Sequence, residues 1–139
     1  MSEKALLKIA HVGIAVWDLD EALITWRDKL GAEVSEVCTL EERGLKIAFL
    51  PVGESLVELL APLHEQSEIS SFLEKRGPGV HHLCFGVADI QERLNTYKER
   101  GLRVLMETPE IGAEGDPVAF LHPKSTSGVL VELLQETKR

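Results

Sequence analysis

The stretch HVGIAVWDLDEALITWRDK at residues 11–29 aligns without a gap with HLCFGVADIQERLNTYKER at residues 82–100. The offset is 71 residues (82 − 11), and His, Val, Asp, Glu, Leu and Thr recur in register. The same offset aligns GLKIAFL at 44–50 with GDPVAFL at 115–121. After a three-residue insertion, LVELL at 56–60 meets LVELL at 130–134. We therefore interpret the chain as two copies of one module.

Each copy has the pattern of a βαβββ unit. A short apolar strand opens it, and Asp18 or Asp89 then stands as an N-cap residue with a glutamate three positions later, which predicts a helix. The helices should end at Gly31 and Gly101. Their buried stripes are expected at the helical i, i+4, i+7 spacing, at Leu19, Leu23, Trp26 and Leu30 in the first copy and at Ile90, Leu94 and Tyr97 in the second.

Three further strands are expected in each copy, at about 33–39, 45–51 and 55–60 and at about 103–107, 117–121 and 129–135. Between the copies, SEISSFLEKRG at 67–77 predicts a short helix, and the Gly77-Pro78-Gly79 run that ends it predicts a hinge. The chain is thus expected to form a single domain over 1–139, with module 1 at about 8–60, a linker at 61–80 and module 2 at about 81–136.

Composition limits the function classes. A chain of 139 residues with 44% apolar content suits one compact domain. It has no apolar run of the roughly 20 residues that a bilayer span needs and no signal-peptide pattern, so we expect a soluble cytoplasmic protein with no membrane partner. The net charge of −8 argues against nucleic acid as a partner. Cys38 and Cys84 lie far apart, as is typical of reduced thiols.

Two adjacent histidines, His81 and His82, leave an extended strand on opposite faces. The repeat aligns His82 with His11, and the residues that follow each of them on the same face are small, which leaves room for a cavity. His81 is expected to have a structural packing role. His11 and His82, each with room for a cavity on its own face of the strand, are therefore candidate ligand-binding residues.

The repeat also aligns Glu58 with Glu132, each inside an otherwise apolar strand pattern. A buried carboxylate is costly unless a cation or strong donors compensate it. With His11 and His82, the two glutamates make an N2O2 set that suits Co, Mn, Ni, Zn or Fe better than calcium. The alternative is that duplication copied core residues that have no present function, but this does not readily explain repeated buried glutamates.

The chain resembles the vicinal oxygen chelate superfamily, which includes glyoxalase I and the extradiol dioxygenases. Within it the match is closest to the methylmalonyl-CoA epimerase family. The resemblance is carried by HVGIAVWDLDEAL, LVELLAPL, FLEKRGPGVHHLCFGVADI and IGAEGDPVAFLHPKSTSGVLVELLQ, and it covers nearly the whole chain. It implies an α+β fold in which two tandem βαβββ modules form a cupped eight-stranded mixed sheet around a metal site, in a homodimer.

The resemblance also implies a site and a reaction. The metal ligands would be His11, Glu58, His82 and Glu132, with cobalt as the first choice and manganese, nickel and zinc as alternatives. The reaction would be epimerisation of methylmalonyl-CoA at C2, by proton abstraction and return through a metal-stabilised enolate. Glu132 would be both ligand and catalytic base. Some members have a second glutamate on the strand after the G-x-x segment, where Ile47 stands here.

Outside the ligand set, Lys124 and Ser125 are candidates for binding the CoA phosphates or the substrate carboxylate, although solvated turn residues would fit the same pattern. His64 and His122 are expected to be loop residues. Two other functions stay open: a glyoxalase I-type isomerase (lactoylglutathione lyase), and a small-molecule binding module without turnover. Retention of all four ligand residues argues against the binding module.

Overall fold

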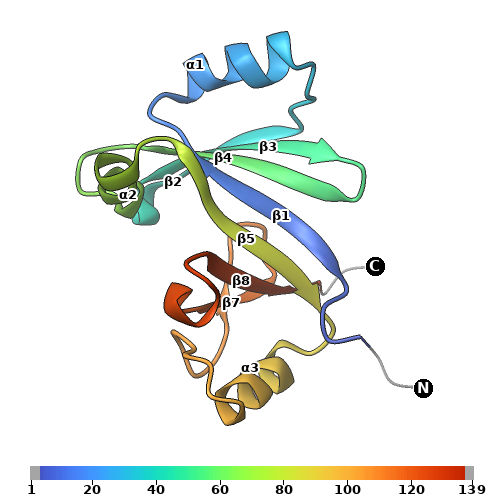
Figure 1. Ribbon diagram of the computed structural model, residues 1–139. Coiled ribbons are helices and arrows are strands. Elements are labelled where there is room, and N and C mark those ends of the chain that lie inside the picture. The colour runs from blue at the N-terminus through green and yellow to red at the C-terminus, as the bar shows by residue number, and fades with distance from the viewer. Residues whose placement is uncertain (1–3, 137–139) are drawn as a thin grey trace. The chain divides into compact units, whose positions relative to one another are not determined.

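The computed structural model describes residues 4–136 and separates them into two compact units (Figure 1). Residues 11–81 form the first unit, and residues 82–136 with 4–10 form the second unit. The chain passes from one unit to the other within β1 (Lys8–Ala15) and again within β5 (Gly79–Val87). Over this part of the chain, every helix is too short or too polar to cross a lipid bilayer.

The first unit is a four-stranded sheet with the strand order β2-β3-β4-β1. Its other strands are β2 (Glu36–Leu40), β3 (Leu45–Val52) and β4 (Ser55–Pro62). The neighbours β2 and β3, and β3 and β4, are antiparallel, whereas β1 and β4 run parallel. A parallel pair needs a crossover connection. The long segment between β1 and β4 supplies it and carries the first helix of the unit.

Helices cover both faces of this sheet (Figure 1). On one face, α1 (Leu19–Leu23) packs on β3 and β4. On the other, α2 (Glu68–Arg76) closes a second apolar cluster. The buried members are Val16, Leu19, Leu23, Ala48, Leu50, Leu59 and Ala61 under α1, and Ala15, Leu45, Ile47, Phe49, Leu60, Ile69 and Leu73 under α2.

The first helix differs from the expected regular α-helix. After α1 the chain continues as a π-helix, η1 (Ile24–Lys29), in which the Leu30 N–H donates to the Thr25 carbonyl at 2.8 Å. A π-turn holds more residues than an α-turn, so it rotates the following residues around the axis. Leu30 is 67% exposed, and its predicted place in the buried stripe is therefore wrong.

The second unit is also a mixed four-stranded sheet, in the order β5-β8-β7-β6. Its strands besides β5 are β6 (Glu110–Ile111), β7 (Pro117–Leu121) and β8 (Leu130–Gln135), and β5 and β8 are the parallel pair. The helix α3 (Ile90–Glu99) packs on β7 and β8, as Figure 1 shows. Ile90 and Leu94 are buried as predicted, and Tyr97 packs against the same cluster.

Caps and glycines lie where the sequence predicts them. The carboxylates of Asp18 and Asp89 accept hydrogen bonds from backbone N–H groups three residues later, at 3.0 and 3.1 Å. Gly31 and Gly101 follow the helices with φ values of +86° and +90°, a left-handed conformation that glycine adopts without a Cβ penalty. Both helices are thus fixed by local chemistry at each end.

The strand predicted at 103–107 is the main error in the second unit. Only Val104 bridges to Leu121, and a regular two-residue strand forms later, at β6. Pro109 stands between the two and has no N–H to donate to a ladder. Val104 lies opposite Leu121 and Glu110 lies opposite Val118, so residues 105–109 face only residues 119–120 and a continuous ladder is interrupted between them.

Candidate active site

The parallel pair β1 and β4 brings one histidine and one glutamate together in the first unit. In the ladder His11 lies opposite Leu56 and Gly13 lies opposite Glu58. The His11 Nδ1 and Glu58 Oε2 atoms are 3.3 Å apart. The two residues are 5% and 7% exposed. An imidazole and a carboxylate are thus held in contact within the buried part of the sheet.

The second unit repeats this arrangement at the equivalent positions. In the pair of β5 and β8, His82 lies opposite Leu130 and Cys84 lies opposite Glu132. The His82 Nε2 and Glu132 Oε1 atoms are 3.1 Å apart, and the two residues are 6% and 7% exposed. Each unit therefore presents one buried histidine-glutamate pair, built by the same strand register.

The neighbours of the two glutamates are apolar or small. Phe49 on β3 lies opposite Glu58, and Phe120 on β7 lies opposite Glu132. The Phe120 ring also meets the His82 ring edge to face, with the centroids 6.5 Å apart. Aromatic neighbours exclude water and lower the local dielectric, which makes an ionised carboxylate costly unless a positive charge compensates it.

The donor set fits a divalent cation. Neutral imidazole nitrogens and carboxylate oxygens are the ligands that zinc, cobalt, manganese and nickel accept in proteins. A bound cation would supply the positive charge that each buried carboxylate needs. His11 and Glu58 in the first unit, and His82 and Glu132 in the second, are thus able to act as metal ligands.

His81 lies among packing residues, as expected from strand alternation. Its ring meets the Phe72 ring of α2 edge to face, with centroids 5.0 Å apart, and the Arg76 guanidinium lies 5.6 Å from the Phe72 centroid. This gives His81 an aromatic contact with the helix. It also distinguishes His81 from His82, whose Nε2 lies 3.1 Å from Glu132 Oε1.

Ile47 is 2% exposed and belongs to the apolar cluster under α2, opposite Leu60 in the ladder. Two residues after Ile47, Phe49 lies opposite Glu58 in the ladder of β3 and β4. Side chains alternate between the two faces along a strand, so Ile47 lies on the same sheet face as Glu58. The position offers neither a proton donor nor a proton acceptor.

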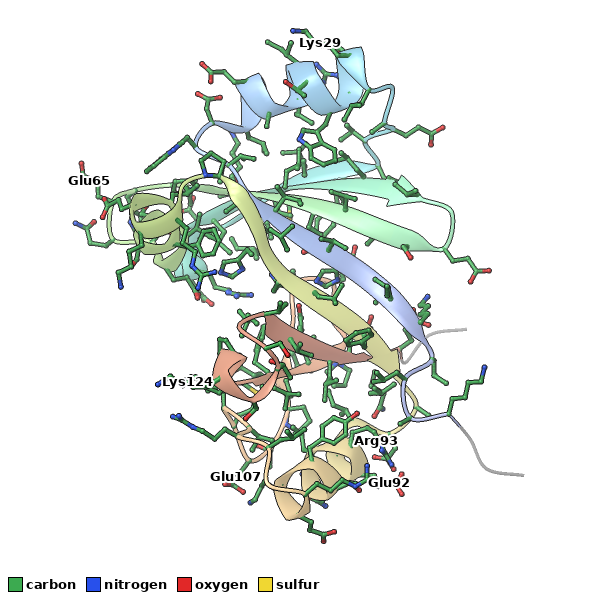
Figure 2. All side chains as sticks on the ribbon, in the orientation of Figure 1. Lys29, Glu65, Glu92, Arg93, Glu107 and Lys124 are labelled. Carbon is green, nitrogen blue, oxygen red and sulfur yellow. The ribbon has the colours of Figure 1, made fainter. Side chains whose placement is uncertain are left out.

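Lys124 and Ser125 lie in η3 (Pro123–Ser125), between β7 and β8. The Ser125 hydroxyl oxygen accepts a hydrogen bond from the Arg103 N–H at 2.9 Å, and its own proton stays available to a further acceptor. Lys124 is exposed and extends from the loop (Figure 2). Both residues are accessible for binding, and Ser125 also has a structural contact.

The two loop histidines have local structural roles. The His64 Nδ1 accepts the Gln66 N–H at 3.2 Å, and the His64 ring packs so closely on Gly44 that an added Cβ there would lie 3.0 Å from it. The His122 Nδ1 accepts the Lys124 N–H at 3.0 Å and caps η3. Sequence reasoning did not identify the surroundings of His122, because Arg103 approaches it only through the fold.

The pKa of His122 lies below its usual range. Loss of hydration around the ring is the largest cause, and the positive charges of Arg103 and Lys124 add to it. The surface around His122 is therefore locally cationic.

A family model described as Glyoxalase/Bleomycin resistance protein/Dioxygenase superfamily matches residues 10–120. The chain is 45% identical to mouse (Mus musculus) mitochondrial methylmalonyl-CoA epimerase over 92% of its length and 72% of that protein. It is also 45% identical to an ethylmalonyl-CoA/methylmalonyl-CoA epimerase of Cereibacter sphaeroides, over 92% of its length and 97% of that protein.

Among solved structures, a methylmalonyl-CoA epimerase in complex with methylmalonyl-CoA and NH4+ is 38% identical, with a TM-score of 0.89 over 96% of each chain. This likeness spans both units. It confirms the expected α+β fold of two βαβββ modules with a mixed eight-stranded sheet.

Proposed function

Because this chain belongs to the Glyoxalase/Bleomycin resistance protein/Dioxygenase superfamily, we propose that it epimerises methylmalonyl-CoA at C2. The observation that carries the proposal is the pair of buried histidine-glutamate contacts at equivalent strand positions. Relatives named as epimerases at 45% identity support the choice of substrate.

We propose that His11, Glu58, His82 and Glu132 together hold one divalent cation, with cobalt as the first choice. The duplication supports this, because an internal symmetry supplies the same two donors from each module. When bound, such an ion supplies Lewis-acid stabilisation of the charge that develops on the thioester oxygen during proton removal. The four side chains would hold the ion, and substrate oxygens would complete its coordination.

The proposed catalytic base is Glu132. Its carboxylate has two oxygens, so one can serve as a ligand while the other takes the C2 proton. A positioned carboxylate is able to act as a general base for this proton. The His82 Nε2 atom lies 3.1 Å from Glu132 Oε1. Charge that appears only as the proton leaves is stabilised in the transition state, which raises the rate and not only the affinity.

Inversion needs a proton from the opposite face of the substrate plane. Ile47 is not able to provide it, which leaves water or another acid of the chain for that step. The isotope pattern distinguishes the routes. In a two-base route the first epimerised product carries solvent deuterium, whereas a single base that carries the same proton between faces returns part of the original hydrogen.

The test is to incubate the cobalt-loaded protein with one epimer of methylmalonyl-CoA in D2O. Stereochemistry and deuterium at C2 are followed together, with chelator-treated protein as the control. We expect inversion and deuterium incorporation in the loaded sample only. Neither change, with the metal content verified, would exclude epimerisation. Turnover of methylglyoxal with glutathione in place of methylmalonyl-CoA would indicate a glyoxalase I-type enzyme.

The remaining parts of the proposal concern context. We propose an acyl-CoA as the small-molecule partner, a homodimer as the assembly and the cytoplasm as the location. Residues 1–139 are proposed to act as one functional domain, because each module contributes half of the ligand set. Lys124 and Ser125 are proposed to bind the CoA part of the substrate.

A further inference from the structure

Three basic side chains come together at one end of the second unit: Arg103, His122 and Lys124, here called the basic cluster. Arg103 follows Gly101 at the end of α3, His122 follows β7, and Lys124 lies in η3. Their backbones are tied to one another. The His122 N–H donates to the Arg103 carbonyl at 2.8 Å, and the Lys124 N–H donates to His122 Nδ1 at 3.0 Å.

Ser125 adds one more contact to these backbone hydrogen bonds, because its hydroxyl oxygen accepts a hydrogen bond from the Arg103 N–H at 2.9 Å. With Nδ1 as an acceptor, the neutral His122 ring carries its proton on Nε2, where it is a donor. The cluster therefore combines a guanidinium, an ammonium and an imidazole N–H on a braced backbone. Donors of these types bind phosphate.

The cluster is cationic and uncompensated. Within residues 4–136, neither the Arg103 side chain nor the Lys124 side chain forms an ion pair, whereas Lys98 in the same unit pairs with Glu107. The lowered pKa of His122, due first to loss of hydration and then to Arg103 and Lys124, agrees with two positive charges near the ring. The chain as a whole carries a net charge of −8, so a local group of positive charges is an exception that favours an anionic ligand here.

The duplication shows that the cluster is particular to the second module. At the offset of 71 the equivalent positions are Ala32 (103 − 71), Pro51 (122 − 71) and Gly53 (124 − 71). In the first unit these three residues line an open hollow of about 560 Å³ with Trp26 and Leu30. At these positions the second module has three basic residues in place of small and apolar ones. The three-residue insertion between the repeated blocks lies in the same part of the chain.

The cluster also lies close in the chain to the proposed base. The loop 126–129 connects η3 to β8, which carries Glu132, and is held by a hydrogen bond from the Thr126 hydroxyl to the Val129 carbonyl at 2.7 Å. A substrate whose reacting carbon lies at Glu132 thus has a cationic surface on the same unit.

Resting on the proposed acyl-CoA substrate, we propose that the basic cluster of Arg103, His122 and Lys124 binds the phosphate groups of the CoA moiety. The guanidinium of Arg103 is suited to two hydrogen bonds with one phosphate, and Lys124 supplies a mobile second charge. Ser125 braces the loop and donates its remaining hydroxyl proton. The cluster acts on substrate affinity and has no part in proton transfer.

The first test compares methylmalonyl-CoA with methylmalonyl-pantetheine, which lacks the diphosphate and the 3′-phosphoadenosine and therefore carries no phosphate. In the double variant Arg103→Gln/Lys124→Gln we expect KM for methylmalonyl-CoA to rise roughly three- to tenfold with kcat nearly unchanged. KM for the pantetheine thioester should not change. Lys98→Gln is the matched control, since it also removes an exposed lysine charge from the second unit. An equal change of KM for both substrates would overturn the proposal.

A second measurement separates this proposal from the proposed function. Adenosine 3′,5′-bisphosphate carries phosphates but no thioester, so its dissociation constant, measured by calorimetry, does not depend on epimerisation. We expect the double variant to weaken it by a similar factor and Lys98→Gln to leave it unchanged. Weaker binding in the double variant supports the cluster even if the D2O experiment excludes epimerisation. An unchanged dissociation constant would overturn the proposal that the basic cluster binds phosphate, even if epimerisation is found.

Discussion

At the scale of single residues, Glu58 and Glu132 are related by the internal repeat but have different surroundings. Gly13 lies opposite Glu58 in the ladder, whereas Cys84 lies opposite Glu132. The paired imidazole presents Nδ1 to Glu58 and Nε2 to Glu132. Two carboxylates that began as copies are therefore in a position to serve different roles.

Replacement of each glutamate by glutamine separates ligand from base. The amide oxygen still coordinates metal but does not take the C2 proton, so metal-saturated Glu132→Gln should lose about 10² to 10⁴ in rate. Metal-saturated Glu58→Gln should keep most of its activity. Epimerisation and C2 deuterium exchange are measured side by side, with metal content checked in both samples. Similar residual rates in the two variants would reject Glu132 as the base.

A second residue-level prediction concerns the basic cluster. Arg103→Gln should raise the pKa of His122, because it removes a positive charge that disfavours the protonated ring. An NMR titration of the imidazole resonances measures this directly. Arg93→Gln is the control, since Arg93 lies over the Tyr97 ring and does not contribute to the field at His122. A His122 pKa that stays the same in Arg103→Gln would show that the two groups are not neighbours.

The sequence points to the four proposed ligand residues because each has an equivalent in the other module, and chance does not readily repeat a buried glutamate. It does not predict the basic cluster, because the residues of this cluster have no basic equivalents in the first module. Arg103 and His122 align with Ala32 and Pro51, so the repeat offers no signal there. Their proximity depends on the backbone pairing of 103 with 122, which lies outside the regular strands.

At the scale of elements, capping and periodicity account for most of what is observed. Both helices begin at the predicted aspartates, and α2 occupies the region predicted for the linker helix. The predictions of helix and strand fail where a second structural effect acts on the same residues. A π-turn exposes Leu30, and a change of register between Val104 and Glu110 interrupts the pairing expected at 103–107. The hydrophobic periodicity of the sequence gives no signal for either effect.

The π-turn can be tested by comparing two leucines that the sequence pattern treats alike. Leu94 is 1% exposed, so Leu94→Ala should cost about 2–5 kcal/mol of unfolding free energy. Leu30 is 67% exposed, and Leu30→Ala should change that free energy by less than about 0.5 kcal/mol. Urea denaturation of the two variants measures both values. Equal losses would mean that Leu30 packs in the core and that the helix is regular.

At the scale of the whole molecule, the proposed site gives metal binding a stabilising role. The buried carboxylates of Glu58 and Glu132 would lose their compensating charge on chelation. An ion present at a hundredfold excess over its dissociation constant stabilises the folded state by about 2.7 kcal/mol. We therefore expect EDTA to lower the melting temperature of the protein by several degrees. Identical melting curves with and without EDTA would contradict metal binding at these glutamates.

The proposal that the two histidine-glutamate pairs hold a single metal ion is tested most directly by metal stoichiometry. Cobalt-loaded, desalted protein is analysed for ions per chain in the wild type and in His11→Ala, His82→Ala and His81→Ala. We expect one ion per chain in the wild type and in His81→Ala, and far less than one in both ligand variants, because each removes a donor from the same centre. Two ions per chain, or one ion retained when either His11 or His82 is replaced, would contradict the account.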